Sequence, residues 1–415
     1  MRHSTSSTSR ATLPREEPAT GHDLDAPESG VRIQAAPAAS ELDRFMDHMI
    51  KLEASDLYLS VGSPPVFRAA GASLKGRKPV TTEQLDAMFE ETLTQPQKVQ
   101  FDLTCELNFA VTRGDGRYRV NVFKQRGEKG MVVRLVKTKV RTLDELGYPA
   151  ILKDIAMTRR GLVLVVGGTG SGRSTALAAM IDHRNTLEGG HILTIEDPIE
   201  FIHPHKGCVV TQREIGIDTL SAEAALKNAL RQAPDVVLIG EIRDIRTMDA
   251  ALELADTGPL CISTMHANSA DQAVERVLTF FPPDRHAEIT SRLAMSLRAV
   301  VSQRLVPTVD GKRTAAVEIM LNTPRVQALI RRSEFSSLKD AMSQSTAEGC
   351  RTFDAALFEL FAAGRVSAQT ALAAADSTNN VRLLIERWKS SGGRAASSHE
   401  KELRLLPDAR LAGNH

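Results

Sequence analysis

The chain has 415 residues, enough for two or three domains, and its 42% hydrophobic content is sufficient to build folded cores. Its 52 basic residues nearly balance its 51 acidic residues, so the formal net charge is +1. This balance provides no bulk electrostatic attraction to nucleic acid or to an anionic membrane surface. We therefore expect no nucleic-acid partner.

Cysteine spacing and the lengths of the apolar runs exclude further classes of protein. Cys105, Cys208, Cys261 and Cys350 stand far apart without a C-x-x-C pair, which favours reduced structural thiols over a zinc site or a disulfide framework. No run approaches 18 consecutive apolar residues, as a membrane-spanning helix would require. The first 30 residues contain no apolar core of a secretory signal, so the sequence predicts a cytosolic protein.

The amino-terminal part begins with residues 1–39, which are rich in Ser, Thr, Ala and Pro without periodicity and are predicted to be a disordered tail. From Ser40, a plausible N-cap, apolar residues recur at helical spacing from Leu42 to Ile50. The segments "DLYLSV" and "GMVVRLV" alternate as strands do, and "LNFAVTRGDGRYRVNVF" is typical of a hairpin. We predict an α+β domain over residues 40–140.

The middle of the chain contains four nearly continuous apolar runs, "LVLVV", "HILTI", "VVLIG" and "LCISTM", separated by helical stretches. Such runs are typical of buried parallel strands, so residues 141–284 are predicted to form an α/β nucleotide-binding core. Residues 285–388 are predicted to be helical, with one apolar stripe at Ile289, Leu293, Leu297 and Val300. Residues 389–415 return to the composition of a disordered tail.

A phosphate-binding loop is predicted at Gly167-x4-Gly172-Arg173-Ser174, between the strand "LVLVV" and an apolar helix. Its glycines let successive N–H groups turn toward phosphate oxygens, and the helix dipole favours the same negative charge. The Ser174 hydroxyl is then placed to bind Mg²⁺. The alternative is a Gly/Ser-rich turn without a ligand. The residues expected to hold the nucleotide are Gly167, Gly168, Thr169, Gly170, Ser171, Gly172, Arg173, Ser174 and Thr175.

Arg173 stands where such loops carry lysine. Lysine offers a compact ammonium that lies against the β- and γ-phosphates, whereas arginine is longer and planar. We therefore expect phosphate binding to survive in part and turnover to be impaired more strongly.

Acidic residues follow two of the predicted strands. Glu196, Asp197 and Glu200 come after "ILTI", and Glu241 follows "VVLIG". Ligands of open α/β sheets lie beyond the carboxyl ends of the strands, so Glu241 is expected to hold Mg²⁺ while a second carboxylate activates water. The alternative for each glutamate is a solvated strand end. His266, after the fourth run, could sense the γ-phosphate or be an ordinary hydrogen-bonded residue.

Five segments of the chain together resemble one known family. They are "GGTGSGRST", "HILTIEDPIEFIH", "TQREIGIDTLS", "ALRQAPDVVLIGEIRD" and "STMHANSADQAVERVLTFFP". In order and spacing these segments resemble the PilT-like ATPases that retract type IV pili, and the resemblance covers residues 40–388. "MIDHRN", "LRQAPDV" and "ADSTNNVRLLIE" resemble the PilU branch more than PilT itself.

The resemblance implies a PAS-like N-terminal domain that moves against a RecA-like P-loop core, followed by the helical C-terminal region. It also implies a homohexameric ring that binds ATP and Mg²⁺ at subunit interfaces. By the same resemblance, Glu200 is the candidate for activating water, Glu241 is the second acidic residue, and His266 acts together with Arg276. Arg173 departs from the family, which has lysine at this position.

The resemblance also assigns two arginines of the N-terminal domain. Arg119 and Arg134 match arginines that reach the phosphates from a neighbouring subunit. From the residues alone, Arg119 lies on the polar side of a strand whose other side is Tyr118, Val120 and Val122. That position suits a phosphate contact, but it favours a merely solvated charge.

Two functions remain for the whole chain. The first is a motor that hydrolyses ATP to power pilus retraction and twitching motility at the inner face of the inner membrane. Its expected partners are an inner-membrane platform protein and a paralogous retraction ATPase. The alternative is a nucleotide-binding regulatory or structural subunit with weak hydrolysis, because of Arg173. A secretion or pilus-extension ATPase is disfavoured, since that branch usually carries a four-cysteine metal insert.

Overall fold

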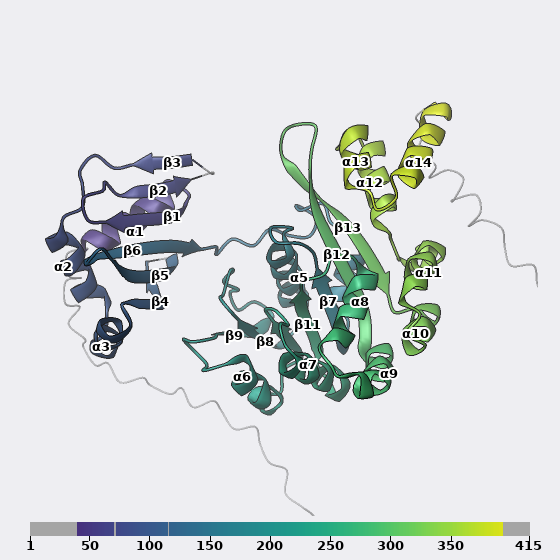
Figure 1. Ribbon diagram of the computed structural model, residues 1–415, viewed down its shortest axis with the longest axis horizontal. Helices are drawn as coiled ribbons and strands as arrows, with labels where there is room; N and C mark the ends of the chain where they lie inside the picture. The colour runs from purple at the N-terminus through teal and green to yellow at the C-terminus, as the bar shows by residue number, and fades with distance from the viewer. Residues whose placement is uncertain (1–39, 70–71, 115, 393–415) are drawn as a thin grey trace, which may run out of the picture.

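The computed structural model describes residues 40–69, 72–114 and 116–392, so the predicted tail 1–39 and residues 393–415 of the second predicted tail lie outside it. Figure 1 shows an N-terminal α+β domain joined by a linker to a larger core, with further helices at the carboxyl end. Among the described residues, six strands form one sheet and seven strands form the other. No helix in these ranges is both long and apolar enough to cross a membrane.

The N-terminal domain is an antiparallel sheet in the order β3-β2-β1-β6-β5-β4, packed against three helices. The helix predicted from Ser40 is α1, and its capping box is complete: Ser40 Oγ accepts from Asp43 N at 3.0 Å. The elements are α1 (Glu41–Lys51), β1 (Ala54–Ser60), β2 (Val66–Ala69), β3 (Ala72–Lys75), α2 (Thr82–Thr92), α3 (Gln95–Thr104), β4 (Glu106–Arg113), β5 (Gly116–Gln125) and β6 (Glu128–Val136).

Strand β5 buries one side and exposes the other, as its alternating sequence predicts. Tyr118, Val120 and Val122 lie in the domain core, and the Tyr118 hydroxyl donates to the main-chain oxygen of Met46 at 3.1 Å. Arg119 is on the opposite side. Its register partner across the β5–β6 pair is Arg134, so the two predicted arginines stand side by side on one face.

The core sheet has the strand order β13-β12-β7-β11-β10-β8-β9. Strands β12, β7, β11, β10, β8 and β9 run parallel, while β13 pairs with β12 in antiparallel fashion. The elements of this part are α4 (Ile151–Ala156), β7 (Gly161–Val166), α5 (Arg173–Leu187), β8 (Gly190–Glu196), β9 (Cys208–Glu214), α6 (Ala222–Ala229), β10 (Val236–Ile239), α7 (Ile245–Thr257), β11 (Leu260–Met265), α8 (Ala270–Thr279), α9 (His286–Ser296), β12 (Leu297–Pro307) and β13 (Arg313–Leu321).

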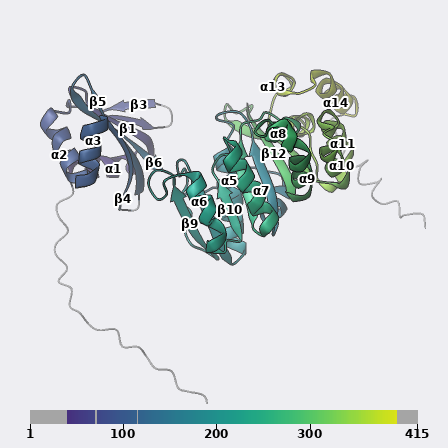
Figure 2. The ribbon, with the colours of Figure 1, turned by 60° about the horizontal axis from the view of Figure 1, so that its bottom comes forward.

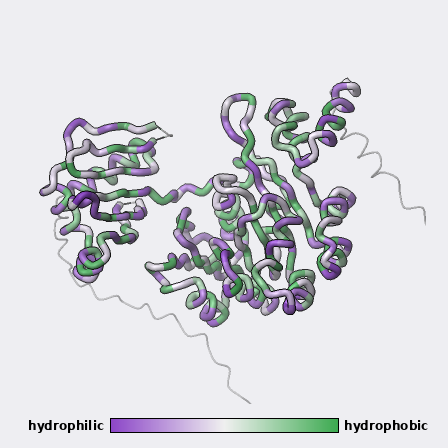
Figure 3. The backbone as a smooth tube through the Cα atoms, viewed as in Figure 1, coloured by the Kyte–Doolittle hydropathy of each residue, from purple (hydrophilic) through white to green (hydrophobic). Residues whose placement is uncertain are grey.

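Both faces of this sheet are buried. Leu162 and Leu164 of β7 pack on one face with helices α6 to α9 and with α10 (Pro324–Arg331) and α11 (Leu338–Gln344). Val163 and Val165 pack with α4 and α5 on the other face. Figure 3 shows the hydrophobic strands in the interior of the core, and Figure 2 shows the helices that cover it. The four apolar runs predicted as parallel strands are β7, β8, β10 and β11, because strands covered on both faces need continuous apolar sequence.

The helical stripe predicted at Ile289, Leu293, Leu297 and Val300 is wrong in its second half. Helix α9 ends at Ser296, and Leu297 and Val300 belong to β12. The side chains from Ala299 to Gln303 are buried without interruption, as in a strand covered on both faces, and the β-branched Val300 and Val301 favour a strand. The central sheet therefore continues beyond residue 284, where the core was expected to end.

Of the helices that follow β13, α10 and α11 belong to the cluster around Leu162 and Leu164, and the last three, α12 to α14, pack at the end of the β12–β13 pair. They contribute an apolar cluster around Phe353 and Leu357, to which β12 adds Val306 and β13 adds Ala316. Helix α14 extends two residues into the segment predicted as the second tail. The helices are α10 (Pro324–Arg331), α11 (Leu338–Gln344), α12 (Phe353–Ala362), α13 (Ala368–Ala374) and α14 (Thr378–Ser390).

Candidate nucleotide-binding site

The predicted phosphate loop joins the end of β7 to the start of α5. Gly170 and Gly172 adopt left-handed φ angles of 76° and 93°, which favour glycine. A Cβ atom at Gly167 would lie 2.5 Å from the main-chain oxygen of Gln303, so that position admits no side chain. Within the described residues, no side chain caps the first N–H groups of α5. These donors and the helix dipole make the loop suited to an anion.

The loop is supported from behind by a residue that the sequence analysis missed. Gln303 of β12 is buried, and its Nε2 donates to the main-chain oxygen of Ser171 at 2.6 Å. Its Oε1 accepts from the hydroxyl of Tyr148 at 2.9 Å. The segment "LRAVVSQRLVP" carried the only signal for Gln303, a polar side chain within an apolar run. Gln303 therefore links the loop to β12 and to Tyr148.

The acidic residues converge on the start of α5. A cavity of about 140 Å³ is lined by Ser174, Glu196, Asp197, Glu200 and Glu241 with ten other residues. The side chains come from three neighbouring places, the first turn of α5 and the carboxyl ends of β8 and β10. The structure thus brings together the predicted metal ligands Ser174 and Glu241 and the predicted water-activating Glu200.

The oxygen-rich donor set fits Mg²⁺. The Ser174 hydroxyl and the carboxylates are hard oxygen ligands, and Mg²⁺ is usually held by one or two carboxylates together with substrate phosphates and water. The part of the chain that the structure describes contains no cluster of three or more His, Cys, Asp and Glu side chains that could hold a metal ion. Ser171 Oγ is buried and lacks a protein partner among the described residues, leaving one more polar atom at the loop.

The Glu241 carboxylate contacts two side chains, those of Arg243 and His266. Arg243 Nε donates to Glu241 Oε2 at 2.6 Å, and a second nitrogen of Arg243 lies 3.3 Å from Asp197 Oδ2. His266 Nε2 is 2.8 Å from Glu241 Oε1, within ion-pair distance. The predicted histidine therefore contacts the predicted metal ligand directly.

Arg173 points from the loop toward the histidine. Its Nη1 donates to the main-chain oxygen of Met265 at 3.0 Å and lies 3.4 Å from His266 Nδ1. Burial lowers the pKa of Arg173, although Glu241 and Glu200 act in the opposite direction. The guanidinium thus contacts both the last residue of β11 and the histidine that follows it.

Glu196 differs from the other acids of the cavity. Burial raises the pKa of its carboxyl, and the donors Thr194 and Gln212 offset this only in part. Glu196 Oε1 accepts from Thr194 Oγ1 at 2.7 Å and from Gln212 Nε2 at 3.1 Å. Glu200, by contrast, is exposed at the mouth of the cavity. An exposed carboxylate is better placed to meet a water molecule than one already bonded within the protein.

Of the two arginines of the N-terminal domain, Arg119 reaches an acid of the core, whereas Arg134 pairs within its own domain. Arg119 Nε lies 3.7 Å from Glu214 Oε1, at the end of β9, and Arg134 donates to Asp56 at 2.7 Å. Burial lowers the pKa of Arg119, while Glu214 and Glu200 raise it. Both arginines line a cavity of about 250 Å³ between the two domains. Arg119 is thus paired rather than simply solvated.

Arg276 lies apart from these groups. It is on the exposed side of α8, with its guanidinium carbon 6.0 Å from the centre of the Phe280 ring. The structure therefore brings Glu200, Glu241 and His266 to the phosphate loop, but not Arg276.

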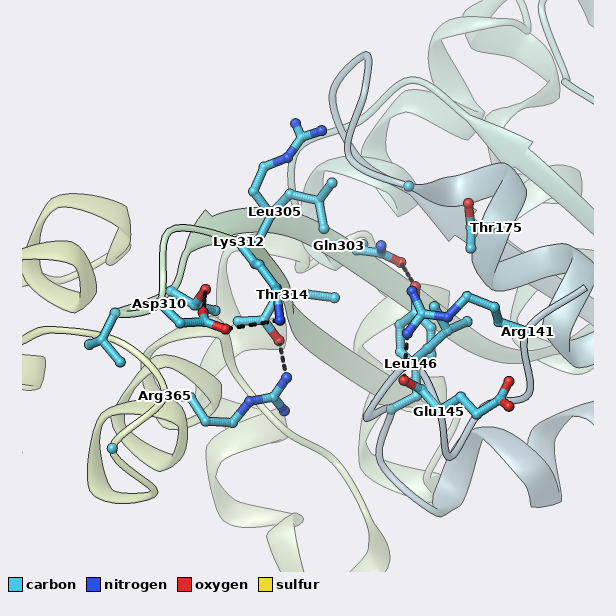
Figure 4. A pocket seen from close by; sticks show the side chains of 17 residues that line it. Arg141, Glu145, Leu146, Thr175, Gln303, Leu305, Asp310, Lys312, Thr314 and Arg365 are labelled. Carbon is cyan, nitrogen blue, oxygen red and sulfur yellow. Dashed lines mark hydrogen bonds and ion pairs between the residues drawn. The ribbon is translucent and has the colours of Figure 1, made fainter. Parts of the chain in front are cut away.

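A second and larger cavity, of about 640 Å³, lies on the other side of the loop (Figure 4). Gly172 and Thr175 line it, whereas Arg173 and Ser174 line the acidic cavity. Its wall carries four basic side chains, Arg141, Lys312, Arg313 and Arg365. The start of α5 thus stands between an acidic cavity and a larger, mainly basic one.

Comparison with known proteins identifies the family of the chain. A family model described as "Type II/IV secretion system protein" matches residues 84–393. The chain belongs to this family. Within the family, the type IV pilus ATPase PilU of Pseudomonas aeruginosa is 48% identical over 368 residues, which are 88% of this chain and 96% of that protein. The type IV pilus retraction ATPase PilT of the same organism is 41% identical over 80% of this chain and 97% of its own.

A solved member of the family has the same fold. The crystal structure of the pilus retraction motor PilT with bound ADP matches 80% of this chain and 96% of its own chain, with a TM-score of 0.75 and 32% identity. The similarity confirms the predicted fold class, an N-terminal PAS-like domain followed by a RecA-like P-loop core. The higher identity to PilU than to PilT agrees with the PilU-like segments in the sequence.

Proposed function

We propose that the chain is an ATP-driven motor of the type IV pilus machinery, and that it powers pilus retraction and twitching motility. The observation that carries this proposal is the convergence of Ser174, Glu200 and Glu241 on one cavity at the start of α5. Relatives named as pilus ATPases, and a solved relative with bound ADP, support the same function.

ATP would lie across the start of α5. Residues 167–175 would hold its phosphates through main-chain N–H groups, with the terminal phosphate toward the acidic cavity. The nucleoside would then extend into the larger cavity that Gly172 and Thr175 line. Ser174 and Glu241 would hold Mg²⁺, which neutralises phosphate charge when it is bound. This placement uses both cavities that adjoin the loop.

Hydrolysis requires a water molecule to attack the γ-phosphorus while the bond to the ADP oxygen breaks. Glu200, exposed at the cavity mouth, would orient this water and accept its proton. Arg119 and Arg134 of a neighbouring subunit would stabilise the charge that develops on the transferred phosphoryl group when that subunit's N-terminal domain closes on the core. The contact between Arg119 and Glu214 supports such a docking of the arginine face against a core edge.

The second candidate is a regulatory or structural subunit with weak hydrolysis. Arg173 favours it, because its guanidinium is engaged with Met265 and His266 rather than free to follow a γ-phosphate. In either case we propose a homohexamer at the cytoplasmic face of the inner membrane, working with a platform protein there and with a paralogous retraction ATPase. The two candidates differ in turnover, not in assembly.

Phosphate release from the purified full-length chain tests the choice. A motor should release phosphate faster than its Glu241→Gln and Glu200→Gln variants, while Glu188→Gln, at an exposed site beyond α5, should match the unmodified protein. If the chain releases phosphate no faster than Glu241→Gln, the motor proposal fails. In that case, stimulation of a paralogous ring by the chain would support the regulatory subunit.

A further inference from the structure

The start of α8 is held by a carboxylate from another element. Glu318 of β13 accepts a hydrogen bond from the main-chain nitrogen of Ala270 at 2.7 Å, and its side chain is fully buried. Ser269 is the N-cap residue of α8, yet among the described residues its side chain makes no capping bond. Because the first N–H groups of a helix need acceptors, Glu318 serves as the cap from outside the helix.

The register of the β12–β13 pair explains why Glu318 reaches α8. Glu318 pairs with Ser302, and two residues along, Met320 pairs with Val300. Met320 and Val300 belong to the apolar cluster beneath α7, α8 and α9, so Glu318 and Ser302 point to the same face. Burial raises the pKa of Glu318 to about 7, and the Ala270 N–H offsets this in part. Glu318 thus places a carboxyl group in the core, at a position where an apolar side chain would carry no cost of burying charge.

The same segment is tied to the C-terminal helices. Arg304 of β12 donates to the main-chain oxygen of Asn268 at 3.3 Å, and it lies 2.7 Å from Asp376. Asp376 also pairs with Lys339 of α11 at 2.9 Å. Lys339 in turn lies 4.0 Å from Asp271 in the first turn of α8. Residues 268–271 are thus connected on two sides to the region between α11 and α14.

The other end of this segment is in the nucleotide site. The main-chain oxygen of Met265 accepts from Arg173, and His266 contacts Glu241. Only a few residues separate these contacts from Ala270. One short segment, residues 265–270, therefore links the start of α8 to the nucleotide site.

We propose that Glu318 is a positioning residue that fixes the His266 segment. We further propose that Glu318, Arg304, Lys339 and Asp376, here called the capping cluster, couple the C-terminal helices to the nucleotide site. A partner that shifts α11 would then alter turnover without touching the nucleotide. The effect on turnover rests on the proposed ATPase function, whereas the effect on local structure does not.

Hydrogen exchange in the full-length protein tests the structural step. In Glu318→Ala, exchange of main-chain amides in residues 268–274 should rise about tenfold, as expected for the loss of one helix cap. Glu318→Gln keeps an acceptor oxygen and should stay within about twofold of the unmodified protein. Lys339→Met should also increase exchange there, whereas Lys98→Met, which removes a comparable ion pair in the N-terminal domain, should not.

Steady-state kinetics of the same variants tests the coupling. Glu318→Ala and Lys339→Met should lower kcat about fivefold to tenfold with KM for ATP within about twofold, and Glu318→Gln should restore most of the rate.

Unchanged exchange at 268–274 in folded Glu318→Ala, or equal exchange in the alanine and glutamine variants, would overturn the proposal. If Glu318→Ala does not fold, unchanged exchange and kcat in Lys339→Met would overturn it instead. An unmodified chain without ATPase activity would refute the proposed function, while the exchange data would still decide whether Glu318 is the cap.

Discussion

Arg173 on the phosphate loop and Met265 at the end of β11 are joined by a hydrogen bond of 3.0 Å, from the guanidinium to the main-chain oxygen. This bond links the phosphate loop to the segment that carries His266. A lysine side chain is one atom shorter than that of arginine, so a lysine ammonium at residue 173 would lie farther from Met265. Compared with the lysine that such loops usually carry, Arg173 therefore adds a contact and also changes the shape of the cation.

Replacing Arg173 by lysine should free the loop from the histidine segment. We expect Arg173→Lys to increase the ATPase rate at least about tenfold, because a compact ammonium can follow the β- and γ-phosphates during transfer. Arg173→Ala, which removes both the contact and the charge, is the control and should lower the rate. Phosphate release at saturating ATP measures both. A lysine variant no faster than the unmodified chain would mean that arginine is fully competent here.

Replacing single glycines of the loop by alanine should show where close packing leaves no room for a side chain. In Gly167→Ala the new Cβ would meet the Gln303 main-chain oxygen at 2.5 Å, so we expect a loss of about 1–3 kcal/mol in the free energy of unfolding and much weaker nucleotide binding. Gly168→Ala is the matched control, because its Cβ would meet no atom of the described residues within 4 Å. Urea unfolding and titration with a fluorescent nucleotide measure the two effects. Equal behaviour of the two variants would contradict the packing described for Gly167.

Removing Arg119 should impair chemistry more than binding. We expect Arg119→Gln to lower kcat by about a hundredfold or more, since a transition-state arginine contributes at least that much in related phosphoryl transfers. Arg113→Gln, which breaks a pair with Asp43 inside the N-terminal domain, should leave kcat near normal. Single-turnover ATP hydrolysis with prebound nucleotide separates the rate from the affinity. If the two variants behave alike, Arg119 has only a structural role.

The buried Glu318 predicts a pH dependence of stability. Its pKa is about 7 in the folded chain against an ordinary 4.5, so between these values the folded state binds more protons than the unfolded state. The contribution of Glu318 to the free energy of unfolding is therefore greatest at low pH. It falls by on the order of 3 kcal/mol as the pH rises toward 7. The charges that face it are Asp271, Lys339 and Asp376. Glutamine mimics the protonated form, so Glu318→Gln should gain stability relative to the unmodified chain between pH 5 and 8.

Denaturant unfolding at several pH values measures this difference, and pH effects of other groups cancel in the comparison. Identical pH profiles for Glu318→Gln and the unmodified chain would show that Glu318 titrates normally. The direction of the pH dependence is diagnostic. If the surroundings stabilised the charged carboxylate, the free energy of unfolding would instead rise with pH.

The sequence predicted the centre of the core better than its edges. Strands β7, β8, β10 and β11 are covered on both faces, so their apolar runs are continuous and easily recognised. Strand β9 stands at the sheet edge, and its alternating burial gave a weaker signal. The apolar spacing of β12 predicts a helical stripe, because a short apolar run does not by itself distinguish a buried strand from a helix.

The chemistry of the site was predictable where it depends on residues near the ends of strands. Ser174, Glu200 and Glu241 meet because parallel strands end at one edge of the sheet. Gln303 and Glu318 were not predictable, since Gln303 contacts Ser171 across 132 residues and Glu318 caps a helix 48 residues away. Such contacts follow from the pairing of β12 and β13 with the core, which local sequence patterns do not specify.

Nucleotide binding to the folded, full-length chain tests the central claim most directly. Calorimetric titration with ATP and Mg²⁺ should give a saturable heat that Gly167→Ala weakens strongly and Gly168→Ala does not. The absence of any binding heat at millimolar ATP, in protein with intact circular dichroism, would contradict the account.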